Sequence, residues 1–473
     1  MINKVQSFTR SAKAVIGVMH DTQSVVKWVK NQNEMVDVSV NKITFSELKG
    51  WSFIDDQSKL VHQSGGFFSI DGIAINTNWG TVPHWEQPII NQPEIGYLGF
   101  ITKEFNGILY FLVQAKIEPG NVNNVQLSPT LQATKSNYTQ KHKGKSPLYL
   151  DYFLNATSRQ ILLDQLQSEQ GARFLKKRNR NIIIKIEEEI ELHDNFIWLT
   201  LGQIKNLMSL DNLVNMDTRT VISGISYIDY DQSELMSTKQ NLTVENTASL
   251  GEKVLHSYLY KGTAVNTIDD IISFITSMKS TFELDIKNIS LSKMKGWKIT
   301  NREIHHENSQ YFKVIPVDVR INNREVVNWT QPMIEPSQEG ICAFVAKEIN
   351  GVLHFIVQAK LECGNFDIIE LAPTVQCITG NYRQSSSFNL PFLNYVLNDK
   401  NKNVVIDCLQ SEEGGRFYKE QNRNMIIVAG DEIENTLPSN YVWMTLNQLQ
   451  LFNRFNNYLN IQARSLLAAL PIN

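Results

Sequence analysis

Apolar and polar residues alternate along residues 107–121, and the chain contains this pattern twice. Residues 107–121 read GILYFLVQAKIEPGN and residues 351–365 read GVLHFIVQAKLECGN, with ten of the fifteen positions identical. Alternation with a period of two predicts a strand that directs one apolar face into a core. In the first copy this face holds Leu109, Phe111, Val113, Ala115 and Ile117.

The opposite face of each predicted strand carries an amide, an ammonium group and a carboxylate in one row. Side chains two positions apart on a strand stand on the same face, roughly 6–7 Å from each other. The row is Gln114, Lys116 and Glu118 in the first copy and Gln358, Lys360 and Glu362 in the second. The row provides groups for proton transfer, and the alternative is a solvated strand face with a surface ion pair.

Other stretches predict elements of both types, which makes the fold class α+β. Helical periodicity is found in residues 21–33 and 214–225, and strand-like patterns in residues 66–75, 96–105, 127–138 and 182–186. Asn106-Gly107 predicts a hairpin turn before the strand in residues 107–121, which we call the QAK strand after its residues 114–116. Residues 168–179 predict a helix capped by Ser168, with basic side chains at its end.

The order of these elements recurs at a nearly constant spacing. The pairs Lys116 and Lys360, and Trp85 and Trp329, are each separated by 244 residues. The segment LQSEQGARFLKKRNRN is answered by LQSEEGGRFYKEQNRN. A period this long indicates a duplicated domain rather than a solenoid. We expect a first repeat in residues 1–228, a linker in 229–262 and a second repeat in 263–473.

Composition narrows the classes of function. A chain of 473 residues with a formal net charge of -3 does not favour binding to nucleic acid. The N-terminus lacks the continuous apolar core of a signal peptide, and no run is long enough to span a membrane. The four cysteines form no C-x-x-C pair. We therefore expect a cytoplasmic protein with free thiols and no membrane partner.

Polar residues shared by both halves lie on and beside the QAK strand, and they predict the lining of a pocket. Arginine forms bidentate contacts with phosphate oxygens, so Arg173 and Arg178 are candidates for binding a diphosphate. A solvated basic helix end would explain them equally well. The other candidates for substrate contact are Trp85, Asn121, Gln132, Asn137, Tyr138, Lys360, Glu362, Tyr382 and Arg416. For Trp85, Asn137, Tyr138 and Tyr382, packing in the core is the alternative.

Motifs of several other enzyme classes are missing from the sequence. It contains no G-x-G-x-x-G after a strand, no G-x-x-x-x-G-K-[ST], no H-E-x-x-H and no G-x-S-x-G. His84 is replaced by Asn328 in the second half, which excludes a duplicated histidine base.

Four segments resemble the NDP-hexose 2,3-dehydratases, enzymes of deoxysugar biosynthesis. They are QAKIEPGN, SPTLQATKSNY, LDQLQSEQGARFLKKRNRN and VNMDTRTV, and the resemblance extends over both halves. It implies a tandem duplication of a Nudix-like mixed-sheet domain flanked by helices, and a homodimer. The implied substrate is a nucleotide diphosphate-linked 4-keto-6-deoxyhexose, commonly the dTDP-glucose derivative. No metal or redox cofactor is implied.

Dehydration of such a sugar requires a base at C3, an acid for the C2 hydroxyl and a donor at the C4 oxygen. From the strand pattern we assign proton transfer to Glu118, the enolate oxygen to Lys116 and sugar orientation to Gln114. Cys363 replaces Pro119 in the second copy, so we expect the first row to carry the chemistry. The alternatives are a non-catalytic sugar-nucleotide-binding protein and a Nudix-type hydrolase.

Overall fold

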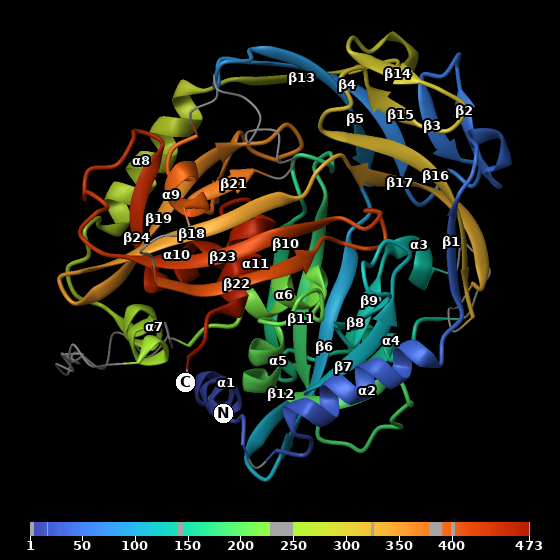
Figure 1. The fold of residues 1–473 in the computed structure, drawn as a ribbon. Helices are drawn as coiled ribbons and strands as arrows, with labels where there is room; N and C mark the ends of the chain where they lie inside the picture. Colours follow the sequence, from blue (N-terminus) through green and yellow to red (C-terminus); the bar gives the residue numbers. More distant parts are fainter. Residues whose placement is uncertain are drawn as a thin grey trace.

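Four β-sheets and the helices around them form the protein in a computed structural model (Figure 1). The structure describes residues 4–16, 18–139, 146–227, 249–322, 326–377, 390–398 and 403–472, without the side chain of Asn137.

Each half of the chain supplies one seven-stranded sheet. The first has the order β10-β11-β6-β7-β12, with β8 beside β7 and β9 beside β6. Its strands are β6 (Gly96–Phe105), β7 (Ile108–Ile117), β8 (Val125–Ser128), β9 (Leu131–Ala133), β10 (Ile161–Ser168), β11 (Arg178–Lys185) and β12 (Phe196–Thr200). The sheet is mixed, because β11 pairs with β6 in parallel and the other pairings are antiparallel.

The second half repeats this sheet strand for strand, with the order β20-β19-β18-β23-β22, β21 beside β18 and β24 beside β19. Its parallel pairing is between β18 and β23. The strands are β18 (Gly340–Ile349), β19 (Val352–Leu361), β20 (Ile369–Ala372), β21 (Val375–Cys377), β22 (Asn403–Ser411), β23 (Gln421–Ala429) and β24 (Tyr441–Thr445).

Two five-stranded sheets exchange one strand between the halves. The first joins β2 (Trp51–Ile54), β3 (Lys59–His62), β4 (Ser69–Thr77) and β5 (His84–Asn91) to β13 (Leu284–Ile289) of the second half. The other joins β14 (Trp297–Ile299), β15 (Ile304–His306), β16 (Phe312–Ile321) and β17 (Asn328–Pro336) to β1 (Val38–Lys42) of the first half.

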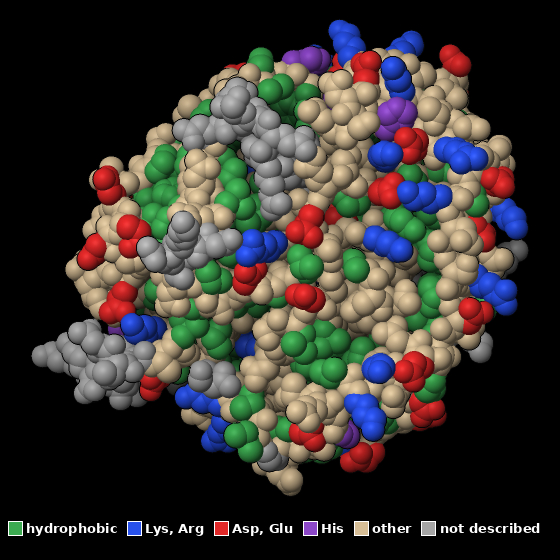
Figure 2. Space-filling model, viewed as in Figure 1, with side chains coloured by type: hydrophobic (Ala, Val, Ile, Leu, Met, Phe, Trp, Pro, Cys, Tyr) green, Lys and Arg blue, Asp and Glu red, His purple; other side chains and the backbone are tan. Residues whose placement is uncertain are grey.

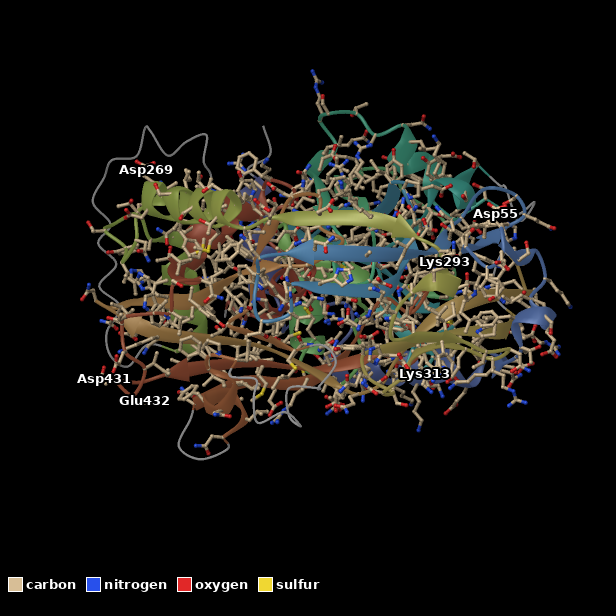
Figure 3. All side chains as sticks on the ribbon, turned by 90° about the horizontal axis from the view of Figure 1, so that it is seen from above. Asp55, Asp269, Lys293, Lys313, Asp431 and Glu432 are labelled. Carbon is tan, nitrogen blue, oxygen red and sulfur yellow. The ribbon has the colours of Figure 1, made fainter. Side chains whose placement is uncertain are left out.

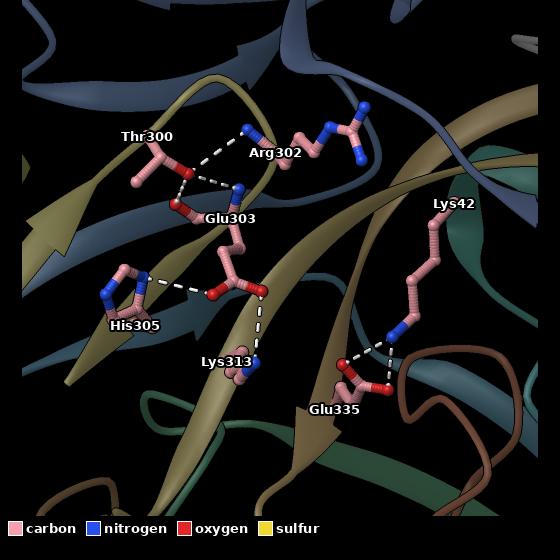
Figure 4. A network of polar contacts seen from close by, with 7 residues as sticks. All are labelled: Lys42, Thr300, Arg302, Glu303, His305, Lys313 and Glu335. Carbon is pink, nitrogen blue, oxygen red and sulfur yellow. Dashed lines mark hydrogen bonds and ion pairs between the residues drawn. The ribbon is translucent and has the colours of Figure 1, made fainter. Parts of the chain in front are cut away.

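Side-chain contacts accompany the exchange of β1. Lys42 Nζ on β1 lies 2.6 Å from Glu335 Oε1 on β17, and Figure 4 shows this pair together with the pair between Glu303, which precedes β15, and Lys313 on β16. In Figure 3, Asp55, Lys293 and Lys313, which belong to or adjoin the five-stranded sheets, lie at the end of the molecule away from Asp269. The two halves are thus joined by backbone hydrogen bonds as well as by packing.

Eleven α-helices lie in the described ranges, and their order repeats. They are α1 (Lys4–Lys13), α2 (Thr22–Glu34), α3 (Lys135–Tyr138), α4 (Leu150–Leu154), α5 (Leu201–Leu207), α6 (Met216–Ser223), α7 (Leu250–Leu259), α8 (Ile268–Thr281), α9 (Leu393–Leu397), α10 (Leu446–Asn453) and α11 (Ile461–Ala469). None of them is long and apolar enough to cross a membrane.

Helix α7 lies inside the segment that the sequence predicts as a linker, and it has the contacts of α1. Ser11 Oγ on α1 donates to the carbonyl of Leu109 at 2.5 Å, and Ser257 Oγ on α7 donates to that of Leu353 at 2.6 Å. Residues 229–248 of this segment lie outside the described residues. The repeated structure therefore includes α7, and the boundaries of the two repeats remain a proposal.

Several predicted elements are confirmed. Strand β7 has its predicted apolar face, Leu109 to Ile117, in the main core, and β6 has its predicted bounds. Asn106 and Gly107, with φ of 51° and 78°, form the predicted hairpin turn between them. Helices α2 and α6 lie where periodicity places them. The predicted strand over 127–138 is instead two short strands and helix α3.

The helix predicted over residues 168–179 is wrong. Ser168 ends β10, Arg178 begins β11, and the segment between them is a turn in which Glu169 N donates to the carbonyl of Lys177 at 3.0 Å. Leu175 N donates to Ile90 O and Lys176 N donates to Gly364 O, so the backbone is hydrogen-bonded to other segments instead of to itself. These tertiary contacts override the local helical preference.

Candidate active site

A cavity of about 530 Å³ lies between the two halves of the chain, beside the end of strand β7. This volume falls in the range of roughly 300–1,000 Å³ that is typical of small-molecule sites. Its walls have three parts: Lys116, Glu118 and Gln132 at the end of the sheet; Trp51, His62, Phe67 and Phe68 from the first five-stranded sheet; and Asn328, Trp329, Thr330, Gln331, Glu413 and Arg416 from the second half.

The predicted polar row forms a buried ion pair in this cavity. Lys116 Nζ lies 3.0 Å from Glu118 Oε1, and the two side chains are 10% and 7% exposed. Lys116 Nζ also donates to the carbonyl of Gln132 at 3.4 Å. The pair is therefore not a solvated surface contact, because the cavity removes both groups from bulk water.

The third member of the row, Gln114, lies outside the cavity lining. It is in the interior of β7, opposite Ser128 on β8 and Phe196 on β12. The predicted candidate Gln132 does line the cavity, and its Oε1 accepts from Asn215 Nδ2 at 3.4 Å.

Acidic side chains from three further segments line the cavity around this ion pair. They are Asp217 on α6, Glu169 after β10 and Glu413 after β22. Burial raises the pKa of Asp217 well above its usual range, and Glu413 and Glu169 add to the effect. Burial also raises the pKa of Glu413 to about 7, although Arg416 opposes it. The helix dipole favours an ionised Asp217, but burial together with neighbouring carboxylates outweighs it.

Lys177 supplies a second ammonium group to the cavity, opposite Glu169. Burial lowers its pKa to about 8, while Glu169 acts in the other direction. Its Nζ donates to the carbonyl of Glu94. The site thus combines carboxyl groups that favour the neutral form with cations that can meet developing negative charge.

Comparison of the two halves of the sequence does not identify Asp217, although it lies in the segment VNMDTRTV. The equivalent position in the second half is Gln462. A search for polar residues shared by both copies discards a residue that only one copy has. The one feature of the sequence that could have drawn attention to Asp217 is its position in the first turn of the helix predicted over residues 214–225.

Two pairs of loops cross between the halves, and the crossing at Gly120 and Gly414 brings Glu118, Glu413 and Arg416 into the cavity. Gly120 N donates to the carbonyl of Gly414 at 2.7 Å, and Gly364 N donates to that of Gly171 at 2.6 Å. A Cβ atom on Gly120 would lie 1.6 Å from Phe417 O. Only glycine permits such a close approach of the two backbone segments.

This crossing places each loop arginine in the opposite half. The Arg416 guanidinium carbon lies 4.3 Å from the ring centroid of Phe68 and lines the cavity. Arg173, its counterpart, lies 4.2 Å from the ring of Phe312 in the second half. The structure therefore places Arg416 beside Lys116 and Glu118, and it places Arg173 elsewhere.

The second polar row lies in a region equivalent to this cavity. Glu362 Oε1 accepts from Gln376 Nε2 at 2.9 Å, and burial raises the pKa of Glu362 against the effects of Lys360 and Arg173. Glu420 occupies the place that corresponds to Lys177. Its two carboxylate oxygens are buried and accept no hydrogen bond from the described residues.

The remaining candidates lie away from the cavity. Trp85 Nε1 donates to Gln87 Oε1 at 2.9 Å, and Asn121 Nδ2 donates to the carbonyl of Asn124 at 2.7 Å. The Tyr138 ring packs edge-on against Tyr97. The Arg178 guanidinium lies 4.0 Å from the Phe366 ring centroid.

Two further candidates and one loop are not described by the structure. Tyr382 and the basic loop 141–145 lie outside the described residues, as does the side chain of Asn137. Within the described ranges, no three His, Cys, Asp or Glu side chains are placed to hold one metal ion. On the face shown in Figure 2, acidic and basic side chains are interspersed.

Comparison with known proteins identifies the family. The sequence model of the NDP-hexose 2,3-dehydratase family matches residues 22–225 and again residues 268–470. A relative from Saccharopolyspora spinosa, named dTDP-4-dehydro-6-deoxy-alpha-D-glucopyranose 2,3-dehydratase, is 42% identical over 99% of this chain and 95% of its own length. Relatives with the same name from Amycolatopsis orientalis and Streptomyces violaceoruber are 38% and 39% identical, covering 97% and 95% of this chain and 92% and 97% of their own lengths.

The chain belongs to the NDP-hexose 2,3-dehydratase family. It is therefore a dehydratase built from two repeats, and the loss of water places its reaction among those of the hydro-lyases.

Proposed function

We propose that this protein removes the C2 hydroxyl group, as water, from dTDP-4-keto-6-deoxy-D-glucose and forms the 3,4-diketo-2,6-dideoxy sugar. The observation that carries the proposal is the buried Lys116–Glu118 pair in a cavity of ligand size, in a chain whose relatives bear this activity in their names. The same geometry supports the assignment of roles.

The first step is removal of the C3 proton by the Glu118 carboxylate. The C4 ketone acidifies this proton, because the electron pair that is released becomes an enolate on the C4 oxygen. C3 and the C4 oxygen are neighbours on the sugar. The polar atoms of Glu118 and Lys116 are 3.0 Å apart, so they can reach both positions at once. Lys116 then stabilises the enolate electrostatically.

In the second step the enolate re-forms the C4 carbonyl and expels the hydroxyl group from C2. The immediate product is an enol with a C2–C3 double bond. Its tautomerisation, with a proton added at C2 and one lost from the C3 hydroxyl, gives the diketo sugar. Gln132 replaces Gln114 in the role of orienting the sugar, because it lines the cavity.

We assign the diphosphate to the part of the cavity near Arg416 and Lys177. Arg416 presents a guanidinium group stacked on Phe68, and phosphate oxygens suit its geometry. The aromatic wall of Trp51, Phe67 and Phe68 offers a surface for the nucleotide base. Arg173 and Arg178, which the sequence favoured for the diphosphate, instead face rings of the second half.

Finer structural expectations also belong to this proposal. We infer that each repeat is Nudix-like, which superposition on a Nudix hydrolase would test. We also infer that the protein is a cytoplasmic homodimer, and light scattering of the purified protein would test its oligomeric state.

The test of the activity is incubation of the pure protein with dTDP-4-keto-6-deoxyglucose, followed by mass spectrometry. We expect a product that has lost one molecule of water. Release of a sugar phosphate would identify a hydrolase instead, and unchanged substrate that remains bound would identify a binding protein. Either result would contradict the proposal.

A further inference from the structure

Residues that precede and follow Asp217 in the sequence form hydrogen bonds that hold helix α6 in place. The N-cap residue Asn215 accepts from Thr218 N at 2.8 Å through Oδ1, and its Nδ2 donates to Ser128 Oγ at 2.9 Å. Two residues after Asp217, the buried Arg219 extends into the second half, where its Nη1 donates to Ser465 Oγ at 2.5 Å. Helix α6 therefore cannot turn freely, and Asp217, which is 2% exposed, is held against the cavity.

The other carboxyl groups of the cavity have polar partners. Glu118 pairs with Lys116, Glu169 accepts from Asn179 Nδ2 at 2.6 Å, and Glu413 accepts from Gly415 N at 3.0 Å. The Asp217 carboxyl forms no hydrogen bond with the described residues. A buried carboxyl group of this kind can donate a proton to a ligand in the cavity.

The charged groups that face Asp217 come from every segment packed around it. Glu413, Glu169 and Glu118 disfavour its ionised form, and Lys116 favours that form. Burial adds to the effect of the three glutamates and raises the pKa of Asp217. The position thus holds a proton in the same cavity as the Lys116–Glu118 ion pair.

We propose that Asp217 is the general acid that protonates the C2 hydroxyl group as it leaves the sugar. This inference rests on the proposed function, and it adds the acid that the Lys116–Glu118 pair lacks. The C2–O bond breaks and its electron pair takes the Asp217 proton, so water departs and Asp217 becomes a carboxylate. In the tautomerisation Glu118 gives its proton to C2, and Asp217 accepts the proton of the C3 hydroxyl. Both groups then return to their starting states.

The second half lacks this acid. At the equivalent place Asn460 caps α11 through Ala463 N at 2.9 Å, just as Asn215 caps α6, but the residue two positions after the cap is Gln462 instead of an aspartate. An amide can donate a hydrogen bond, yet it cannot protonate a departing hydroxide. Of these two equivalent positions, only the one in the first region therefore holds an acid.

The experiment compares two leaving groups in Asp217→Asn. The first substrate is dTDP-4-keto-6-deoxyglucose, and the second is its 2-deoxy-2-fluoro analogue, from which fluoride leaves without needing a proton. We expect water elimination to fall by roughly 10²–10⁴-fold, the usual contribution of a positioned acid. We expect fluoride elimination to remain close to the wild-type rate. In D₂O the variant should still exchange the C3 proton of the normal substrate.

Several outcomes would overturn this role. Unchanged water elimination, or an equal loss with both leaving groups, would show that Asp217 is not the acid. Asp217→Glu should restore part of the water elimination, and Asp407→Asn, which alters a carboxyl of the exposed ion pair with Arg423, should change neither rate. If Asp217→Asn does not fold, Asp217→Ser provides the same comparison. Failure of the wild-type protein to eliminate water would instead overturn the proposed function itself.

Discussion

The two repeats place the same frame around two regions, and the groups within that frame differ. Both have the Lys-Glu row at the end of a strand, and both receive an arginine from the opposite half. The first region has Asp217 and Lys177 where the second has Gln462 and Glu420. Shared residues therefore describe the frame of a duplicated site, while the differences indicate where the chemistry occurs.

The electrostatics of the second region argue against binding of a diphosphate there. Glu420 replaces an ammonium group, and the buried Arg173 already faces Glu420 and Glu362. A buried cation that balances carboxylates has less charge to offer a phosphate group. We infer that the second region binds nucleotide weakly or only supports the fold.

The largest expected difference between the regions comes from their strand carboxylates. Glu118→Gln keeps the shape of the side chain and removes the proposed base, so turnover should fall by roughly 10²–10⁴-fold. Glu362→Gln, the matched change in the second row, should leave turnover near the wild-type value. Steady-state kinetics on dTDP-4-keto-6-deoxyglucose would measure both. If Glu362→Gln is the inactive variant, the assignment of the two repeats is reversed.

A smaller difference is expected from the crossed arginines. Arg416→Ala removes a charged donor from the cavity and should weaken substrate binding by about 1–3 kcal/mol. Arg173→Ala should leave substrate affinity unchanged and lower the free energy of unfolding, because it removes a buried side chain that packs on Phe312 and the cation that faces Glu362. Calorimetric titration and urea unfolding would separate the two effects. Equal losses of affinity would return Arg173 to the binding site.

An element of the fold could be predicted from the sequence where its structure depends on neighbouring residues in the chain. The β7 strand, its apolar face and the turn at Asn106-Gly107 follow from short-range alternation and turn chemistry. The helix over 168–179 failed because Lys176 and Leu175 form hydrogen bonds with segments distant in the sequence. No local pattern indicates such partners.

The site was predictable to the same extent. Lys116 and Glu118 meet because they are two apart on one strand, which the sequence shows directly. The crossing of the loops decides that Arg416, and not Arg173, faces this pair, and it depends on contacts such as that between Gly120 and Gly414. Asp217 was missed for another reason: candidate residues were selected because both halves share them, and the second half has Gln462 at this position.

The smallest effect concerns stability at the pair of equivalent positions Lys177 and Glu420. Burial raises the pKa of Glu420 from 4.5 to about 8. The folded protein therefore keeps this proton at pH values where the unfolded chain has lost it. The stability gained from the bound proton is fully present below about pH 4.5 and is lost as the pH rises through about 8. Burial lowers the pKa of Lys177 from 10.5 to about 8. The part of the stability that depends on the charge of Lys177 therefore changes only at higher pH.

Urea unfolding between pH 5 and pH 8 would measure this difference. Glu420→Gln should make the decline of unfolding free energy with pH less steep, by at most about 1.4 kcal/mol per pH unit, the limit for one proton. Lys177→Gln should not change the slope between pH 5 and 7, because Lys177 is charged in both states there. An unaltered slope in Glu420→Gln would show that this carboxyl is ionised in the folded protein. The two regions would then differ more in charge, because a carboxylate would stand where the first region has an ammonium group, and diphosphate binding in the second region would be disfavoured further.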